Sequence, residues 1–201
     1  MAISAPEPLA PAHDLSGFSC GKPALDHWLR THALSNQRKG FTAVLVVHDS
    51  GRVVGYYGLA PTAVVPAAMP RSIRTGQPPD PVPCLLLGQL ATDVSWAGRG
   101  IGTGLLKHAL ERSVRAAELI GGRALVVKAV DVEAAQFWQR RGFLASRDDP
   151  FVLFRSIGVM AASLAMATPP RSWRRRDGEP LVVDTRRRNR QPPFTPPPSP
   201  H

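Results

Sequence analysis

The sequence predicts an α/β (α+β) domain of about 160 residues. Short apolar runs of strand length recur along the chain, and turn-forming residues bound each of them. Between these runs, apolar residues three and four positions apart mark helices. In order, the elements are a leading helix, three strands, a glycine-rich turn with its helix, a strand, a helix and a last strand. This order is typical of helices packed on a sheet.

The chain begins with residues 1–14, which are rich in proline and alanine and are expected to form an extended lead-in. A helix is predicted over residues 23–37. Pro23 suits its first turn, where a missing N–H costs nothing, and Gly40 suits the position just past its end. The apolar face of this helix comprises Leu25, Trp28, Leu29 and Ala33.

A hairpin and a long connection follow. Residues 42–48 and 53–60 predict two strands, and Asp49-Ser50-Gly51-Arg52 predicts the turn between them. The next segment, residues 61–83, contains seven prolines. Because it is long and punctuated by proline, we expect this connection to be functional or mobile rather than part of the core.

The stretch from Leu85 to Leu106 is the one around which the chain is organised. Its first half is a dense apolar run of strand length, and Asp93 is expected to order the turn after it rather than to act as a base. Its second half is a glycine-rich turn that leads into a helix reaching about residue 119. The first N–H groups of a helix lack intrahelical partners, and glycines let a ligand approach the backbone. This turn is therefore a candidate phosphate site.

The glycine spacing excludes two common phosphate-binding loops. The order is Arg99-Gly100-Ile101-Gly102-Thr103-Gly104, so the Gly-x-Gly-x-x-Gly pattern of dinucleotide folds is absent. No Gly-Lys-Ser/Thr closes the loop, which excludes a P-loop. The alternative that the turn only connects strand and helix stays open.

Three further elements complete the predicted domain. They are a strand over residues 124–130, a helix over 132–141 and a strand over about 151–157. Asp131 is placed to cap the helix at its start, and Gly142 lies just past its end.

The composition changes near the C-terminal end. We expect the folded domain to cover residues 15–164, and residues 165–201 to be a disordered tail rich in arginine and proline. Residues 169–201 hold eight arginines against three acidic residues, so half of the formal net charge of +10 lies there. The domain itself remains basic, which favours an anionic partner.

Cysteines and histidines give no sign of a metal site, and none is predicted. Cys20 and Cys84 have neither ligand spacing nor a disulfide pattern, which predicts a reduced, cytoplasmic protein. The histidines considered as ligands are isolated from other ligand types; they are His27, His32, His48 and His108. No secretion signal begins the chain, and the weakly polar run 157–168 is too short to span a bilayer, so a soluble protein without membrane contact is expected.

The glycine turn matches the Arg/Gln-x-x-Gly-x-Gly/Ala signature of the GNAT N-acetyltransferases. Within that superfamily the chain resembles the GNAT-type toxins of toxin–antitoxin systems, which acetylate the amino group of aminoacyl-tRNA and so block translation. Four stretches carry the resemblance in the same order: Phe18–Leu25 with the helix to Arg30, Gly55–Leu59, Pro81–Asp93 and Asp131–Phe143.

The resemblance implies one domain with a central mixed, mostly antiparallel sheet flanked by helices, and strands that splay at an acetyl-CoA cleft. Acetyl-CoA would be the co-substrate, with no metal. The backbone of Leu90, Ala91 and Thr92 would pair with the pantetheine arm like an added strand, and a strand N–H would stabilise the oxyanion. The residues implied to hold the diphosphate are Arg99, Gly100, Ile101, Gly102, Thr103 and Gly104.

One position departs from the family pattern. The family has a Phe-Tyr pair whose tyrosine is thought to protonate the leaving thiolate, whereas this chain has Phe137-Trp138. An indole N–H donates a hydrogen bond but does not titrate near neutral pH. Trp138 and Tyr57 are therefore the candidate catalytic residues, with three alternatives: Tyr57 or water replaces the acid, Trp138 only packs in an active enzyme, or the site is weakened to an acetyl-CoA-binding module.

Partners follow from the same resemblance. Aminoacyl-tRNA is the expected acceptor, and its phosphates would be bound by Arg38, Lys39, Arg71 and Arg74. A cognate, DNA-binding antitoxin and a second copy of the chain are further expected partners. The alternative within the enzyme class is an acetyltransferase that acts on a protein or a small-molecule amine.

Overall fold

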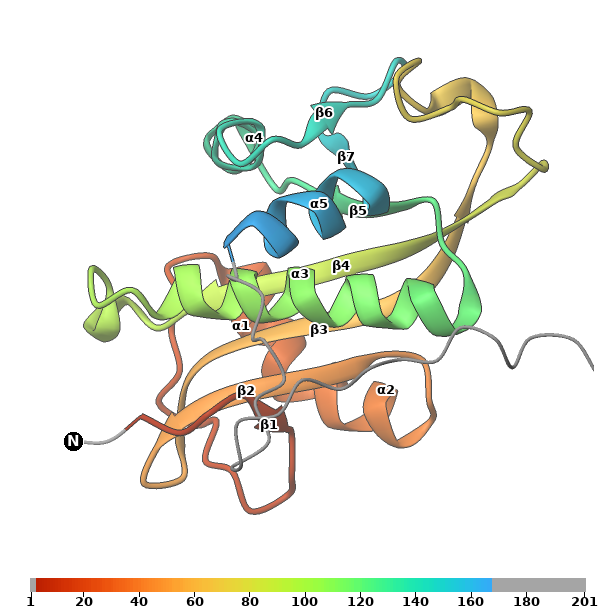
Figure 1. Ribbon diagram of the computed structural model, residues 1–201. Coiled ribbons are helices and arrows are strands. Elements are labelled where there is room, and N and C mark those ends of the chain that lie inside the picture. Colours follow the sequence, from red (N-terminus) through yellow and green to blue (C-terminus); the bar gives the residue numbers. More distant parts are fainter. Residues whose placement is uncertain (1–2, 168–201) are drawn as a thin grey trace, which may run out of the picture. The chain divides into compact units, whose positions relative to one another are not determined.

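The computed structural model describes residues 3–167. Its centre is a seven-stranded sheet in the order β1-β2-β3-β4-β5-β7-β6 (Figure 1). Every neighbouring pair is antiparallel except β4 and β5, which run parallel. The prediction of a mixed, mostly antiparallel sheet flanked by helices is confirmed. The strands are β1 (Glu7–Pro8), β2 (Ala43–Asp49), β3 (Arg52–Val64), β4 (Val82–Thr92), β5 (Ala124–Lys128), β6 (Leu144–Ala145) and β7 (Val152–Ser156).

Helices cover both faces of the sheet. The helix α3 crosses one face with α5 beside it, and α1 and α2 lie on the other side (Figure 1). Helix α4 packs its buried residues into the same core as α3 and α5. The helices are α1 (Pro23–Trp28), α2 (Leu34–Arg38), α3 (Ile101–Ile120), α4 (Val132–Gln139) and α5 (Ile157–Ala167), with a π-helical segment, Leu29–Ala33, joining α1 to α2.

The sheet opens between β4 and β5. The two strands pair only over Leu85–Leu87, whereas β3 pairs with β4 as far as Thr92. Gly88 is an extra residue at this point, because Leu87 and Gln89 face consecutive residues of β3. Such a bulge bends a strand and disturbs its ladder. Among the described residues, the end of β4 therefore has a strand partner on the β3 side alone, which is the splaying that the resemblance implies.

The predicted hairpin is present with a two-residue turn. Ser50 and Gly51 both have positive φ values, 52° and 91°. Two successive positive values are the geometry of the turn whose twist matches that of the flanking strands. The pattern of a glycine beside a short polar residue therefore located this turn correctly.

The connection after β3 differs from its expectation. Met69 and Ile73 are buried, and they pack against Cys84, Val126 and Phe154 of the sheet. The expectation that this segment is not part of the core was therefore wrong, because these two side chains cover apolar sheet surface that none of the helices within residues 3–167 covers.

Three elements were missed, the two-residue strands β1 and β6 and the helix α5. Helix α5 begins where β7 ends, packs Met160 into the main core, and runs three residues past the expected domain limit at 164. The remainder of the expected tail, residues 168–201, lies outside the described residues. No helix within residues 3–167 has the length and apolar character needed to cross a membrane.

Candidate functional site

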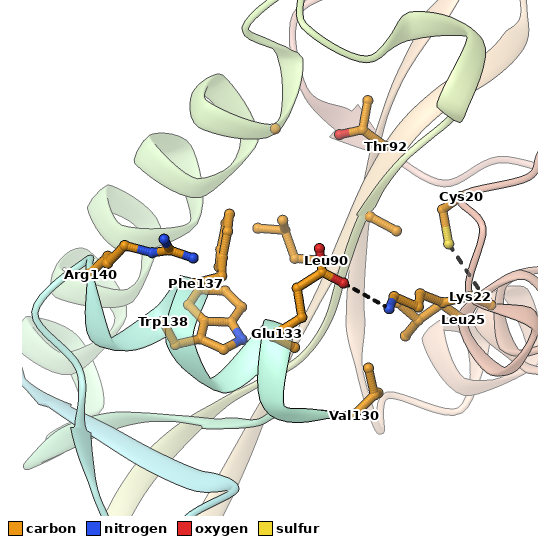
Figure 2. A pocket seen from close by; sticks show the side chains of 13 residues that line it. Cys20, Lys22, Leu25, Leu90, Thr92, Val130, Glu133, Phe137, Trp138 and Arg140 are labelled. Carbon is orange, nitrogen blue, oxygen red and sulfur yellow. Dashed lines mark hydrogen bonds and ion pairs between the residues drawn. The ribbon is translucent and has the colours of Figure 1, made fainter.

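A cavity of about 370 Å³ lies where β4 and β5 separate (Figure 2). Most of its lining comes from three parts of the chain, the segment before and within α1, the end of β4, and α4, and Gly102 and Val130 complete it. The end of β4 contributes Leu90, Ala91 and Thr92, and α4 contributes Phe137 and Trp138. The three predicted pantetheine residues and the predicted catalytic tryptophan therefore lie around one space.

A second cavity continues from the first along the glycine turn. Gly100, Ile101, Gly102 and Thr103 line it, and Arg141 closes it from the end of α4. The two cavities share Thr92, Gly102 and Phe137 as lining residues, so they form one continuous cleft.

The backbone of the turn explains the need for glycine at its start. Gly100 has a φ of 78° and immediately precedes α3, and this left-handed conformation is costly for residues with a Cβ. Gly102 lies so close to β4 that an added Cβ would be 3.2 Å from Thr92 Oγ1. The first N–H groups of α3 are thus presented at the cleft with no side chain in front of them.

Two residues of the predicted diphosphate loop do not line the cleft. Arg99 is exposed and lines neither cavity, although its guanidinium lies 4.6 Å from the centre of the Trp96 ring, which does line the second cavity. Gly104 lines a separate cavity together with His108 and Glu111. The part of the turn that faces the cleft is therefore residues 100–103.

Trp138 is held firmly in the wall of the cleft. It is 8% exposed, and its ring meets Phe137 and Phe143 edge to face at centroid distances of 5.0 and 5.1 Å. In Figure 2 the indole nitrogen lies on the side of the ring toward Glu133. The side chain combines packing with one hydrogen-bond donor at the cleft, and it has no proton to release near neutral pH.

Tyr57 does not reach the cleft, which corrects its prediction as a catalytic residue. It is fully buried beneath α3, with its hydroxyl 2.7 Å from Nδ1 of His108. Burial raises the pKa of Tyr57 to about 12, and burial also lowers the pKa of His108. Adjacent strand residues face opposite sides of a sheet, so Tyr56 points the other way and donates to the carbonyl of Leu25 at 2.8 Å.

An ion pair crosses one end of the cleft. Lys22 Nζ donates to Asp131 Oδ2 at 2.7 Å and to Glu133 Oε2 at 3.3 Å, and Figure 2 shows the second contact. The other oxygen of Asp131 accepts from the Ala134 N–H at 2.8 Å, which caps α4 as predicted. These hydrogen bonds, first that from Lys22, lower the pKa of Asp131. The segment before α1 is thereby tied to the start of α4, a contact that the sequence spacing did not reveal.

Asp93 orders the turn after β4, as expected. The carboxylate accepts hydrogen bonds from the Ser95 N–H at 2.9 Å, from the Ser95 hydroxyl, and from the Ser19 N–H at 3.1 Å. Burial raises the pKa of Asp93, but these hydrogen bonds outweigh it and hold the pKa below its ordinary value. Asp93 therefore joins the turn to the segment before α1. Both of its carboxylate oxygens accept hydrogen bonds in doing so.

The four basic residues proposed for tRNA lie away from the two cavities. Arg38 and Lys39 are exposed at the end of α2, and Arg71 and Arg74 belong to the connection between β3 and β4. None of the four lines the cleft. Their assignment to tRNA stays a prediction.

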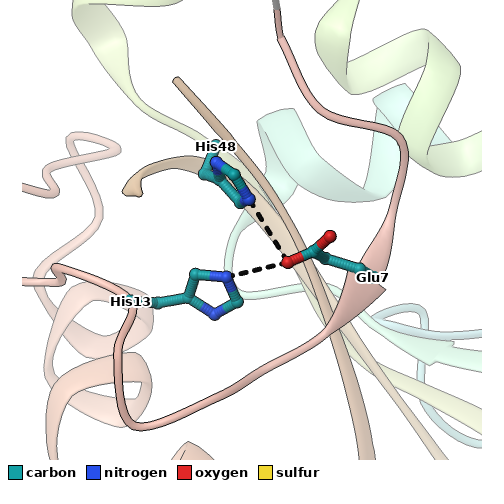
Figure 3. Close-up of side chains that lie close together, drawn as sticks. All are labelled: Glu7, His13 and His48. Carbon is teal, nitrogen blue, oxygen red and sulfur yellow. Dashed lines mark hydrogen bonds and ion pairs between the residues drawn. The ribbon is translucent and has the colours of Figure 1, made fainter. Parts of the chain in front are cut away.

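A cluster of Glu7, His13 and His48 has the residue types of a metal site (Figure 3). The Nδ1 atoms accept backbone N–H groups, from Ala10 at 3.0 Å for His13 and from Gly51 at 3.1 Å for His48. Each Nε2 therefore carries the proton and donates to Glu7 Oε1, at 3.0 and 3.2 Å. A metal at Nε2 would move these protons to nitrogens that already face N–H donors, so the cluster does not fit a metal ion. It fastens the lead-in to the edge of the sheet.

Comparison with known proteins places these features in context. The acetyltransferase (GNAT) domain family matches residues 40–144. A Mycobacterium tuberculosis protein named tRNA-acetylating toxin is 43% identical over 150 residues, which are 75% of this chain and 90% of that protein.

Solved structures agree with this match. AtaT complexed with acetyl-methionyl-tRNAfMet has a TM-score of 0.74 and 27% identity, over 81% of this chain and 99% of that chain. A tyrosine-to-phenylalanine mutant of AtaT bound to the C-terminus of the antitoxin AtaR and acetyl-CoA has a TM-score of 0.68 and 26% identity, over 82% and 99% of the two chains.

Proposed function

This chain belongs to the GNAT acetyltransferase family, and we propose that it transfers the acetyl group of acetyl-CoA to the amino group of aminoacyl-tRNA. The observation that carries the proposal is the continuous cleft, in which an open strand edge leads directly to a glycine turn at the start of a helix. The similarity to a tRNA-acetylating toxin over three quarters of the chain supports the choice of acceptor.

The cleft fits the chemistry of acetyl-CoA in two places. Residues 88–92 of β4 have no pairing on the β5 side within the described chain, so their backbone groups are available to the amides of the pantetheine arm. The N–H groups at the start of α3 suit the negatively charged diphosphate. When an extended ligand binds along the edge of β4 and at the start of α3, its thioester lies at the wall formed by α4.

The reaction forms a C–N bond and breaks a C–S bond. The amine must be neutral to attack, and an α-amino group has a pKa near 8, so about a tenth of it is neutral at pH 7 without a dedicated base. A backbone N–H at the end of β4 donates to the oxyanion that forms on the acetyl carbonyl. The proton that leaves the amine passes to water.

Trp138 acts on the leaving group. Its indole N–H donates a hydrogen bond to the departing sulfur, which lowers the energy of the developing thiolate. Water supplies the proton, because a thiol with a pKa near 8.5 is a tolerable leaving group near neutral pH. Catalysis in this chain therefore depends on stabilising charge rather than on a titrating side chain.

The proposed function includes further partners. The basic surface, including Arg38, Lys39, Arg71 and Arg74, contacts tRNA phosphates. A cognate, DNA-binding antitoxin neutralises the activity, and the chain acts in the cytoplasm, where charged tRNA is found. A homodimer is a further part of the proposal.

The test is acetyl transfer to tRNA. Labelled acetyl-CoA is incubated with the protein and a pool of charged tRNA, and uncharged tRNA serves as the control. We expect label on charged tRNA alone. No label on any tRNA, with acetyl-CoA still bound, would reject this acceptor and favour another amine or a module that only binds acetyl-CoA.

A further inference from the structure

The cavity along the glycine turn contains an arginine that the turn itself does not provide. Arg141 lies two residues after the end of α4 and lines this cavity together with residues 100–103. Arg99, the arginine within the turn, is exposed on the ring of Trp96 and does not line it. The positive side chain that lines the cavity at the glycine turn thus comes from the other wall of the cleft.

Two contacts fix the position of the Arg141 guanidinium. It lies 3.5 Å from the centre of the Phe137 ring, and its Nη1 donates to the Phe137 carbonyl at 3.1 Å. Phe137 is itself a lining residue of both cavities. An arginine held against an aromatic face keeps its remaining donors in a fixed plane, so it loses less rotamer entropy when it binds an anion.

No carboxylate of the described residues forms an ion pair with Arg141, since the ion pairs within residues 3–167 involve other side chains. The side chain is partly buried, and its neighbour Arg140 is also cationic. Burial first, and then Arg140, lowers the pKa of Arg141. A partly desolvated cation without a partner gains most from an anion that enters the cavity.

We propose that Arg141 binds the diphosphate of CoA from the wall opposite the glycine turn and so positions the thioester. This inference rests on the proposed use of acetyl-CoA. The diphosphate then lies between the N–H groups at the start of α3 and a planar guanidinium, which can donate two parallel hydrogen bonds to phosphate oxygens. Arg99 has no part in this contact.

The experiment is calorimetric titration of the full chain without tRNA. The ligands are CoA, 3′-dephospho-CoA, which keeps the diphosphate, and pantetheine, which has no phosphate. The variants are Arg141→Gln, Arg141→Lys and Arg99→Gln, with Arg115→Gln on the exposed side of α3 as the matched control. Melting temperatures check that each variant is folded.

We expect Arg141→Gln to weaken both CoA and 3′-dephospho-CoA by about tenfold and to leave pantetheine unchanged, since a hydrogen bond to a charged group is lost. Arg141→Lys keeps the charge and retains part of the affinity. Arg99→Gln and Arg115→Gln bind as the wild type does.

Three results would overturn the inference. Unchanged CoA affinity in a folded Arg141→Gln variant would remove Arg141 from the site. A loss for CoA but not for 3′-dephospho-CoA would assign Arg141 to the 3′-phosphate instead. A loss in Arg99→Gln equal to that in Arg141→Gln would show that the turn supplies the cation. If the wild type binds no CoA, the proposed function fails instead, which is a different and recognisable outcome.

Discussion

One wall of the cleft is a continuous stretch of chain from Leu85 to Leu106, whereas the other is assembled from segments far apart in the sequence. The continuous wall presents backbone groups: the open edge of β4 and the first turn of α3. The assembled wall presents side chains, notably Trp138, Arg141 and the pair of Lys22 with Glu133.

The two walls therefore have different requirements. A wall of backbone groups binds a ligand only if no side chain covers those groups. Its sequence therefore needs glycine at a few positions. A side-chain wall depends on which groups are present and on how packing orients them. Substitutions in the first wall are expected to act through shape, and substitutions in the second through lost chemistry.

The largest effect is expected where the continuous wall is filled. In Gly102→Val the new side chain stands in the cleft, and its Cβ is already 3.2 Å from Thr92 Oγ1. Overpacking costs of about 3 kcal/mol correspond to a roughly 100-fold weaker affinity for acetyl-CoA. Calorimetric titration of acetyl-CoA measures this loss.

The matched control is Gly104→Ala in the same helical turn. Nothing lies within 4 Å of an added Cβ at Gly104, and this glycine does not line the cleft. Its affinity should equal that of the wild type. Equal losses in both variants would mean that the loss in Gly102→Val does not come from filling the cleft.

The assembled wall is tested at Trp138. Trp138→Phe removes the N–H donor and is expected to lower kcat by roughly 10- to 100-fold, because a hydrogen bond to a charged group contributes about 1.5–3 kcal/mol. The KM for acetyl-CoA should change little. The pH–rate profile should keep its shape, since neither indole nor phenyl titrates. Steady-state kinetics across pH measure all three quantities.

Trp138→Tyr separates donation from packing. It restores a polar donor at the same position and is expected to retain more activity than Trp138→Phe. If Trp138→Phe were as active as the wild type, the tryptophan would only pack against Phe137 and Phe143, and the leaving thiolate would be stabilised by another group.

The difference between the walls also explains what the sequence revealed. The continuous wall was recognisable because strand, glycine turn and helix are local patterns within one stretch. Arg141 was not recognisable as a ligand, since its place depends on where α4 packs. Tyr57 was assigned to the wrong side of the sheet. A strand pattern shows that neighbouring side chains face opposite sides, but the packing of α3 decides which of the two sides is covered by that helix. Helix α5 lacks a distinct polar face, so the spacing of its apolar residues did not indicate a helix.

The smallest effect is expected where the two walls are joined, at Asp93. Asp93→Asn loses the carboxylate that accepts from Ser95 and Ser19. Loss of hydrogen bonds to a charged group costs about 1–3 kcal/mol, so the melting temperature should fall by about 5 °C at pH 7. Activity should change less than in the two preceding variants, because no lining side chain is removed.

The stability that Asp93 contributes to the folded chain depends on pH. The pKa of Asp93 is lower in the folded chain than in an unfolded one. Its contribution to stability is therefore complete above the unfolded pKa, near 4, and is lost as the pH falls through the folded pKa.

The difference in melting temperature between wild type and Asp93→Asn should be full at pH 6–7 and shrink below about pH 4. Asp148→Asn, at an exposed position, is the control, and it should melt at the wild-type temperature at pH 7. A gap for Asp93→Asn that is constant down to pH 3 would mean that the amide disturbs packing, and that the charge of Asp93 does not join the walls.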